Sequence, residues 1–477
     1  MNATHPLTAA QLGIWQGQQA SPDVPYIAAQ YIEVHGDLDV ELLQAATDQG
    51  SRELESATVV LEGTPTQPQW RVVPDIDDAL VHIDLRDETD PVAAAQKWMA
   101  NDFSQPRDLF ADRLIAAVVL TVGDDHHYWY SRVHHVVMDG AGAAALIRRI
   151  VQIYNHLRAG NTPPPSGALP LTELYAAQDR YRSSTRFEAD AAYWRARAHE
   201  LPEPARLTTR TAPPSAVPVI ARAYATAEVT SSVEALAASS GGTVASVLIA
   251  AFGLYLSRCT SFDDVVLSVP VSGRTTARDR ASGGMVSNVL PLHIRISDGE
   301  NAVEYSQRVR AELSGVLRHQ KYPFHEITST RSGFGPVVNV MTFETALELG
   351  QTTTDFHVLS SGMVDDIVLN LYPPLPGGGI RIDLEANPAL YTEYQVRGHL
   401  DRFLHVLAEF AELNDGALRE LSVLTAAERS ALVPRSAEQV SQTATLPELL
   451  RGVPDDTAVI CGDIHLTYRQ LRERIDL

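Results

Sequence analysis

Two runs rich in β-branched and aromatic residues follow each other in the first half of the chain, at residues 113–122 and 126–137. The short segment 123–125, Gly-Asp-Asp, separates them, which is typical of a β-hairpin. After Gly140 the pattern changes to helical spacing, with apolar residues at positions 146, 147, 150, 151, 154 and 157. The pattern therefore predicts a hairpin, then an amphipathic helix, with His134 and His135 where strand gives way to helix.

The residues before this hairpin predict three helices and several strands. Thr8 and Gln11 have the spacing of a capping box, so we expect a helix that continues through Trp15. Asp39 and the Asp90-Pro91 pair are helix-start signals, and they predict helices that end near residues 54 and 103. Strands are predicted at residues 26–35, 57–61 and 69–73.

A second series of strands and helices follows the proline-rich segment 161–170. This alternation predicts an α/β fold in two parts of similar size, residues 1–170 and residues 171–430. Residues 431–477 read as a linker and the start of a truncated further domain, so we expect the natural polypeptide to continue. The helices of the second series are predicted at residues 172–201, from 231, after 243, at 302–318 and at 392–413, and its strands at 221–230, 265–269, 286–296, 337–343, 356–359, 367–371 and 380–384.

Composition and charge exclude several classes of protein. The 477 residues carry 38 Lys and Arg against 59 Asp and Glu, a net charge of −21, and this sign disfavours nucleic acid as a partner. The two cysteines lie far apart and match no metal-binding spacing, and the N-terminus lacks a secretion signal, so a reduced, cytoplasmic compartment is expected. The longest apolar run, residues 244–256, is shorter than the ~18 residues that span a bilayer, so it predicts a core helix and no membrane span.

The histidine pair has the parts of an acid–base site. A neutral imidazole with a pKa near ~6.5 accepts a proton from an attacking amine or hydroxyl, or holds that group by a hydrogen bond. Strand periodicity places His134 and His135 on opposite faces, so only one of them can be the working group, and spacing does not say which. Asp139 could fix the turn by pairing with an arginine from elsewhere in the chain.

These residues also have two other interpretations, one structural and one as metal ligands. A histidine pair beside a turn is more often structural, because buried histidines commonly satisfy their own hydrogen bonds. A metal site would use His126, His127, His134, His135 and Asp139, but the first two lie at the hairpin turn, on the order of 25 Å along a strand from the others. We therefore predict no metal site in this chain.

Residues 134–140, HHVVMDG, match the HHxxxDG signature of nonribosomal peptide synthetase condensation domains. Four further segments resemble motifs of that family in the same order, and the resemblance covers about residues 5–430. A fifth segment, residues 466–471, looks like the opening motif of an adenylation domain, which normally follows a condensation domain. The four condensation-like segments are residues 7–15, 270–274, 283–291 and 319–324.

The second motif of the family is not recognisable, because residues 49–56 occupy its place without its RHExLR-type pattern. This departure, the start of the chain directly at the first motif, and the aromatic residues before the histidines most resemble initiating condensation domains of the enterobactin-synthase kind. Those domains accept an aryl acid from a separate carrier protein. The resemblance therefore implies an aryl acid donor that arrives in trans, in the biosynthesis of a secondary metabolite of the siderophore kind.

The resemblance implies two chloramphenicol-acetyltransferase-like lobes in a V, with a central tunnel that receives a phosphopantetheine arm from each side and holds no bound cofactor. His135 would orient or deprotonate the acceptor amine, Asp139 would pair with Arg274, and Gly140 would donate its amide near the reacting carbonyl. His134 would be structural. Tunnel contacts are expected from Ser287 and Asn288, although packing at a strand start is the commoner role of such residues.

Several singled-out residues also have plain structural interpretations. Arg274 follows a glycine and could be an ordinary surface residue, and residues 322–324, Tyr-Pro-Phe, could form only a rigid turn. Trp15 and Trp129 are expected in the core rather than in a tunnel wall.

The resemblance implies an acyltransferase that forms an amide between two carrier-bound acyl groups. Its partners would be a donor carrier protein, and the acceptor carrier and adenylation domain of the same synthetase. The alternatives are an ester-forming or other carrier-dependent acyltransferase, and a non-catalytic recruitment module that would not need the intact motif. Heterocyclisation domains carry DxxxxD in place of the histidines, and epimerisation domains follow a carrier domain, so both are disfavoured.

Overall fold

The computed structural model describes residues 3–73, 79–327, 335–341, 347–372, 379–413, 416–432 and 456–475. Within them the chain forms two compact units, Met1–Val423 and Leu424–Leu477. The first unit contains the two large sheets and all the residues of the predicted site.

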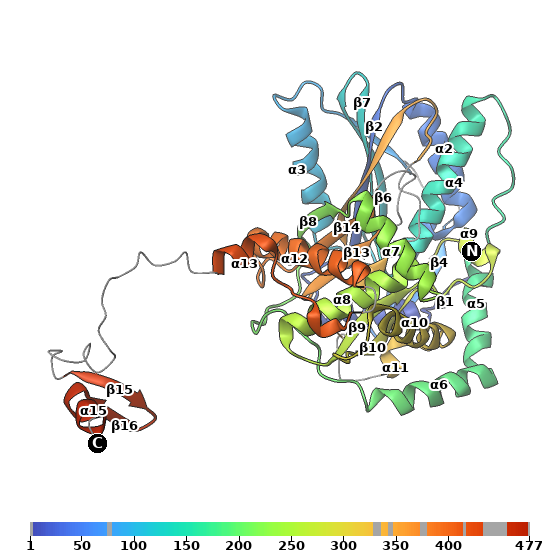
Figure 1. Ribbon diagram of the computed structural model, residues 1–477. Helices are drawn as coiled ribbons and strands as arrows, with labels where there is room; N and C mark the ends of the chain where they lie inside the picture. Colours follow the sequence, from blue (N-terminus) through green and yellow to red (C-terminus); the bar gives the residue numbers. More distant parts are fainter. Residues whose placement is uncertain are drawn as a thin grey trace. The chain divides into compact units, whose positions relative to one another are not determined.

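A five-stranded sheet carries the histidine pair. Its strands lie in the order β12-β2-β7-β6-β5, and only β5 and β6 are parallel neighbours. Figure 1 shows α3 on one side of this sheet and α2 and α4 on the other. The predicted hairpin and the three predicted helices around it are confirmed. The bounds are β2 (Ile27–His35), β5 (Val81–Asp84), β6 (Ile115–Gly123), β7 (His126–His134), β12 (Thr353–Ser361), α2 (Val40–Leu54), α3 (Pro91–Ser104) and α4 (Gly140–Arg158).

The second large sheet has six strands, in the order β10-β9-β11-β13-β14-β8. Its main core lies between this sheet and helices α7, α8, α10 and α12, which Figure 1 shows grouped together. The bounds are β8 (Val219–Tyr224), β9 (Asp264–Val271), β10 (Asn288–Arg295), β11 (Val337–Val340), β13 (Ile367–Leu371), β14 (Arg381–Ala386), α7 (Ala227–Ser239), α8 (Val244–Thr260), α10 (Ala302–Arg318) and α12 (Glu393–Glu412).

Helix α8 contains the longest apolar run, and twelve consecutive residues of it, 246–257, are buried in the core. Among the described residues, no single helix is long and apolar enough to cross a membrane. Helices α7 and α8 pass that test only as a pair, bent by 102°.

The strand β12 links the two sheets. It comes from the second half of the sequence, where a strand at residues 356–359 was predicted, yet it pairs with β2 at the edge of the five-stranded sheet. Residues 29 and 360 face each other in this antiparallel ladder after a bulge between Val358 and Ser360. The end of β12 is thereby brought beside the end of β7, where His134 and His135 lie.

Smaller elements complete the chain. A three-stranded sheet with the order β1-β4-β3 and helix α1 precede the β6–β7 hairpin in the sequence, and α5 and α6 follow it. Unit Leu424–Leu477 contains α13, the β15–β16 hairpin and α15. Four short elements, η1, α9, α11 and η2, lie in connections. The bounds are β1 (His5–Pro6), α1 (Ala9–Ala20), η1 (Ser56–Thr58), β3 (Val59–Thr64), β4 (Gln67–Val72), α5 (Leu171–Arg182), α6 (Thr185–Ala198), α9 (Ala277–Ala281), α11 (Phe324–Ile327), η2 (Leu418–Glu420), α13 (Ala426–Leu432), β15 (Thr457–Cys461), β16 (Ile464–Thr467) and α15 (Tyr468–Ile475).

Several element boundaries differ from the predicted ones; the helical pattern over residues 172–201, for example, forms two helices, α5 and α6. The sequence favoured a strand over residues 221–230 and a helix from Ser231, but the strand ends at Tyr224 and the helix begins at Ala227. The hydroxyl of Thr226 caps this helix by accepting the backbone N–H of Val229, and this local signal was missed. The end of the strand predicted at residues 337–343 lies outside the described residues.

Candidate active site

The histidine pair lies at a strand–turn–helix junction, as predicted. Strand β7 ends at His134, the backbone N–H of His135 donates to the Tyr26 carbonyl at 2.8 Å, and helix α4 begins at Gly140. The Asp139 carboxylate caps the helix by accepting the N–H of Gly142 at 2.8 Å. This cap fixes the turn, and so fixes where the preceding imidazole points.

His134 points away from the cavity into the protein. Its side chain is fully buried, Nδ1 accepts the backbone N–H of Val136, and Nε2 lies 3.1 Å from Oε1 of Gln18. Burial lowers its pKa to about 3, with a smaller contribution from the neighbouring His135. Because both nitrogens are occupied and the ring stays neutral, His134 is placed to hold the junction rather than to exchange protons.

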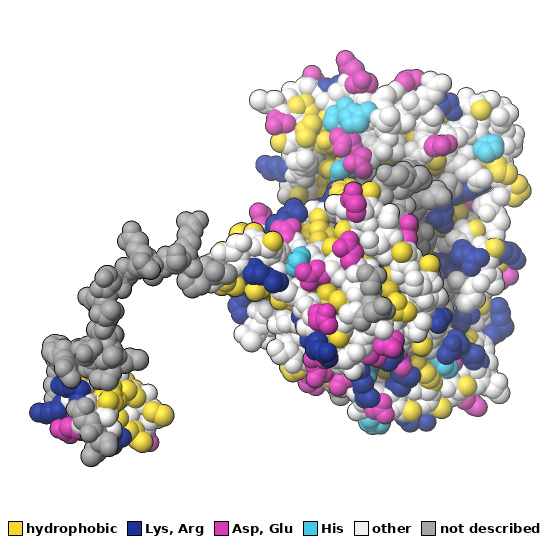
Figure 2. Space-filling view, in the orientation of Figure 1, with side chains coloured by type: hydrophobic (Ala, Val, Ile, Leu, Met, Phe, Trp, Pro, Cys, Tyr) yellow, Lys and Arg dark blue, Asp and Glu magenta, His cyan; other side chains and the backbone are white. Residues whose placement is uncertain are grey.

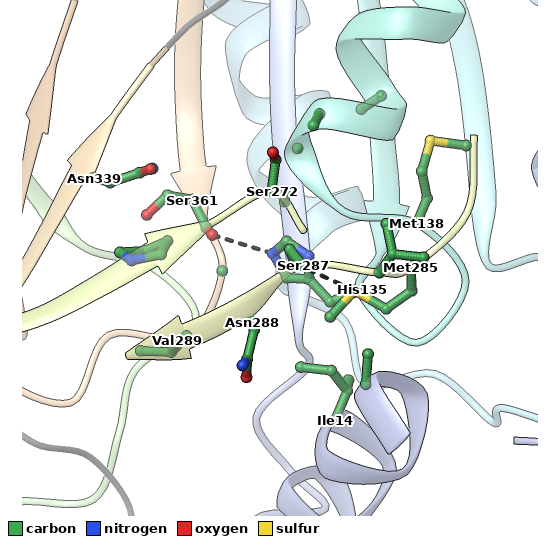
Figure 3. A pocket seen from close by; sticks show the side chains of 18 of the residues that line it. Ile14, His135, Met138, Ser272, Met285, Ser287, Asn288, Val289, Asn339 and Ser361 are labelled. Atoms are coloured by element: carbon green, nitrogen blue, oxygen red, sulfur yellow. Dashed lines mark hydrogen bonds between the residues drawn. The ribbon is translucent and has the colours of Figure 1, made fainter. Parts of the chain in front are cut away.

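His135 lies on the opposite face and lines a large cavity. Its Nε2 lies 3.2 Å from the carbonyl oxygen of Ser361, at the end of β12, as Figure 3 shows. In this arrangement Nε2–H donates to Ser361 and Nδ1 is the nitrogen with a lone pair. Gly362 follows with φ +121°, and a Cβ there would lie 3.1 Å from Nε2 of His135, so this position suits only glycine.

The Asp139 carboxylate joins the two halves of the sequence. It lies 2.7 Å from Nη1 of Arg274 in a pair whose side chains are 2% and 1% exposed, and it also accepts the N–H groups of Val286 and Ser287 at 2.9 Å. Arg274 Nη2 donates in turn to the carbonyls of Gly283 and Gly284. Asp139 is therefore an organising group for the segment around residues 283–287, and its carboxylate is fully engaged.

The other predicted residues lie around the cavity. Gly140 is exposed at the first turn of α4 and lines the cavity, as do Ser287 and Asn288. The Asn288 amide is engaged elsewhere, because Nδ2 donates to the carbonyls of Gln320 and Tyr322 and Oδ1 accepts the N–H of Phe324. Its side chain thus holds residues 320–324 in place at the cavity wall.

The two tryptophans are both in the core. Trp15 is 3% exposed and donates to the Pro65 carbonyl at 3.2 Å. Trp129 is also 3% exposed, but it lines the cavity as well. The expectation of a core position rather than a tunnel wall is confirmed for Trp15, whereas Trp129 is buried in the core and also forms part of the cavity wall.

The cavity has a volume of about 1790 Å³ and is lined by residues of both sheets. One part of it, which we call the β7 branch, lies between the five-stranded sheet and helix α4. The branch follows the face of β7 that carries Trp129, Ser131 and Val133. Trp129 lies six residues before His135, so the branch extends on the order of 20 Å along the strand. Small side chains leave its space open, on the strands beside β7 (Ala28 and Ala117) and on helix α4 (Ala143 and Ala144).

A buried polar network behind His135 was not predicted. The Ser361 hydroxyl donates to Glu385 Oε2 at 2.7 Å, Asn370 Nδ2 donates to Oε1 at 2.7 Å, and Asn339 Nδ2 donates to Asn370. Glu385 is 1% exposed, and burial raises its pKa to about 7. A signal was present, because Arg381, Asp383 and Glu385 alternate with apolar residues in β14, which places three charged residues on one buried face.

The residues considered for a metal site are separated, as the sequence suggested. His126 pairs with His35 at one end of the β2–β7 ladder, whereas His134 pairs with Ile27 at the other end. The structure therefore does not bring His126 and His127 together with the histidine pair.

Comparison with known proteins places this geometry in a family. The Condensation domain model matches residues 1–433. The chain is 30% identical over 482 residues to a dimodular nonribosomal peptide synthase of Bacillus subtilis, covering 98% of this chain and 20% of that protein. It is also 30% identical over 505 residues to enterobactin synthase component F of Escherichia coli O157:H7, covering 98% of this chain and 38% of that protein.

A solved structure agrees with these matches. The starter condensation domain of rhizomide synthetase, in complex with C8-CoA and Leu-SNAC, superposes with a TM-score of 0.82 at 31% identity, covering 88% of this chain and 98% of that one. The chain spans only a fifth to two fifths of the two curated relatives above. The adenylation-like segment 466–471 stays a prediction.

The expected α/β fold of two chloramphenicol-acetyltransferase-like lobes in a V is confirmed by the solved condensation domains that the chain matches. The HHxxxDG segment lies at the cavity that both sheets line. The chain belongs to the condensation-domain family of nonribosomal peptide synthetases.

Proposed function

We propose that this chain catalyses amide bond formation between a donor acyl thioester and an acceptor aminoacyl thioester, each carried on the phosphopantetheine arm of a carrier protein. The observation that carries the proposal is the position of His135. It is the histidine of the pair that lines the cavity, with the exposed Gly140 nearby in the same wall.

In this proposal each site residue has a part in the reaction. The acceptor amine attacks the donor carbonyl, while the Nδ1 lone pair of His135 orients that amine or takes its proton. Gly140 begins α4 and lines the same cavity, and its amide would stabilise negative charge on the carbonyl oxygen. The carbon–sulfur bond of the thioester then breaks, and the departing thiolate takes up the proton.

In this proposal the Asp139–Arg274 pair positions the site and does not contact the substrate. It holds the start of α4 against residues 283–287, and it offers no free oxygen to a substrate because four donors already occupy the carboxylate. Much of the rate would come from confining two tethered substrates in one cavity, which makes the reaction effectively intramolecular. Little proton chemistry is then required of the protein.

The donor acyl group would occupy the β7 branch. The starter-like sequence implied an aryl acid delivered in trans, and the branch is apolar enough for an aromatic ring. Its length, on the order of 20 Å from His135 to Trp129, favours a flexible aliphatic chain as a second candidate. The complex of the rhizomide starter domain with C8-CoA is a precedent for an eight-carbon donor in a relative.

The partners we propose are a separate donor carrier protein and the downstream acceptor carrier and adenylation domain of the same synthetase, in the cytoplasm. Carrier proteins are acidic, and this chain carries a net charge of −21, so docking would depend on local basic or apolar surface.

A donor competition tests the proposal. The purified chain receives one aminoacyl carrier and equal amounts of carriers loaded with acetyl, octanoyl, dodecanoyl and 2-hydroxybenzoyl groups, and mass spectrometry reads the products. Octanoyl or dodecanoyl amide in excess supports the aliphatic donor, and hydroxybenzoyl amide in excess supports the aryl donor. A hydroxyacyl acceptor that gives ester where the amine gives no amide would support the ester-forming alternative. No product from any pair would support the recruitment module.

A further inference from the structure

A second group of histidines lies at the far end of the strands that carry the catalytic pair. Glu33 and His35 are two residues apart on β2, so they share one face of the sheet, and His35 pairs directly with His126 of β7. His126 is eight residues from His134, about 26 Å along the strand, so this group is separate from the cavity.

The three side chains converge on one point. Oε1 of Glu33 lies 2.7 Å from Nε2 of His126 and 3.4 Å from Nε2 of His35, and all three atoms lie within 4.8 Å of one another. The two imidazole rings are stacked with their centroids 4.2 Å apart. Both rings therefore present the same nitrogen to the same carboxylate oxygen.

The backbone holds this arrangement in place. The N–H of Gly36, directly after His35, donates to the Asp125 carbonyl, directly before His126, at 2.8 Å. A third strand also comes close to Glu33, because Nε2 of His357 on β12 lies 3.4 Å from its other oxygen, and His357 itself stacks on Tyr31. Figure 2 shows histidine and acidic side chains side by side on the part of the surface where β2 ends and β7 begins in Figure 1.

Two imidazoles and one carboxylate form a ligand set that suits zinc and neighbouring divalent transition metals. Tetrahedral bonds of ~2.0–2.1 Å place ligand atoms about 3.4 Å apart. The Glu33–His35 separation already has this value, and the Glu33–His126 separation, now 2.7 Å, needs to open by about 0.7 Å. The Nε2 atoms of the two histidines lie within 4.8 Å of each other. The His35 side chain is 53% exposed, so it has room to adjust and leaves a coordination position open to water.

We propose that Glu33, His35 and His126 form a binding site for a divalent transition metal of the zinc class, with water as the fourth ligand. A bound ion would tie the ends of β2 and β7 together. The site is independent of the proposed condensation reaction, and His134 and His135 take no part in it.

Metal titration of the full chain, free of affinity tags and treated with chelator, tests the site. Isothermal titration with Zn²⁺ should show one saturable site per chain, and Co²⁺ should give visible absorption typical of tetrahedral coordination. Zn²⁺ should also raise the melting temperature, because the ion binds the folded state.

The variants His126→Ala, His35→Ala and Glu33→Gln should each weaken Zn²⁺ binding by roughly tenfold or more, since each removes a ligand. His156→Ala and His465→Ala, which remove histidines elsewhere, are the matched controls and should bind as the parent does. Circular dichroism checks that every variant is folded. The proposal is overturned if the parent chain shows no saturable binding, or if His126→Ala and His35→Ala bind Zn²⁺ as tightly as the controls.

Discussion

The carboxylate of Asp139 and the guanidinium of Arg274 meet at 2.7 Å although 135 residues separate them in the chain. Asp139 belongs to the turn that presents His135, and Arg274 follows β9 of the six-stranded sheet. The turn that presents His135 is therefore held by residues from both halves of the sequence. The ion pair keeps this turn in place only while the two halves are packed together.

Removing one partner of this pair should destabilise the fold. Because both side chains are almost fully buried, Asp139→Ala leaves a buried guanidinium unpaired, which costs about 3–5 kcal/mol. The melting temperature should fall, and the double variant Asp139→Ala/Arg274→Met should lose less than the sum of the two single losses. Equal melting curves for Asp139→Ala and the parent chain would show that the pair does not hold the junction.

The burial of His134 predicts a pH dependence of stability. Its native pKa of about 3 is below the ordinary value, so between pH 6.5 and pH 3 the unfolded state binds a proton that the native state does not. Stability is fully present above pH 6.5 and falls, as pH decreases, by up to ~1.4 kcal/mol per pH unit from this group. Urea unfolding from pH 7.5 to 5 should show this slope in the parent and a smaller one in His134→Gln. The same slope in both would mean that His134 is not buried neutral.

Glu385 should give the opposite pH dependence of stability. Its native pKa of about 7 is raised, so between about pH 4.5 and 7 the native state holds a proton that the unfolded state has lost. Stability from this group is present below pH 4.5 and is lost as pH rises through 7. Glu385→Gln should therefore gain stability over the parent at pH 8 but not at pH 5. Because the His134 and Glu385 slopes partly cancel between pH 4.5 and 6.5, each is measured as a difference between variant and parent.

Narrowing the β7 branch should change the donor that is used. Ala143 of α4 lines the branch, and Ala143→Phe would fill part of it. Product from dodecanoyl donors should fall well below product from acetyl donors, while Ala93→Phe on the exposed start of α3 should leave their ratio unchanged. If the ratio stays the same in Ala143→Phe, the donor chain does not occupy this branch.

Local patterns predicted most elements, because caps and apolar periodicity are local properties. The capping box at Thr8 and the proline start of α3 are confirmed, and α10 and β13 have the predicted bounds. The pairing of β12 with β2 could not be predicted in this way, since strand order depends on contacts between distant segments. The lobe boundaries at residues 170 and 430 stay a prediction.

The same distinction between local patterns and contacts of distant segments applies to the site. Periodicity placed His134 and His135 on opposite faces, but the cavity that distinguishes them arises from residues of both sheets. The roles of His135, Gly140, Ser287 and Asn288 came from resemblance and stay predictions. The Glu385 network was missed because its members come from four strands, β11, β12, β13 and β14, that no local pattern brings together.

The most direct test of the central claim is the amount of condensation product formed by His135→Ala. The variant, the parent and the control His156→Ala receive the same acyl and aminoacyl carriers, and mass spectrometry measures the amide on the acceptor carrier under single-turnover conditions. Loss of the imidazole should reduce the rate by roughly 100-fold or more, with folding and the control unaffected. Product formed at the parental rate by a folded His135→Ala variant would contradict the account.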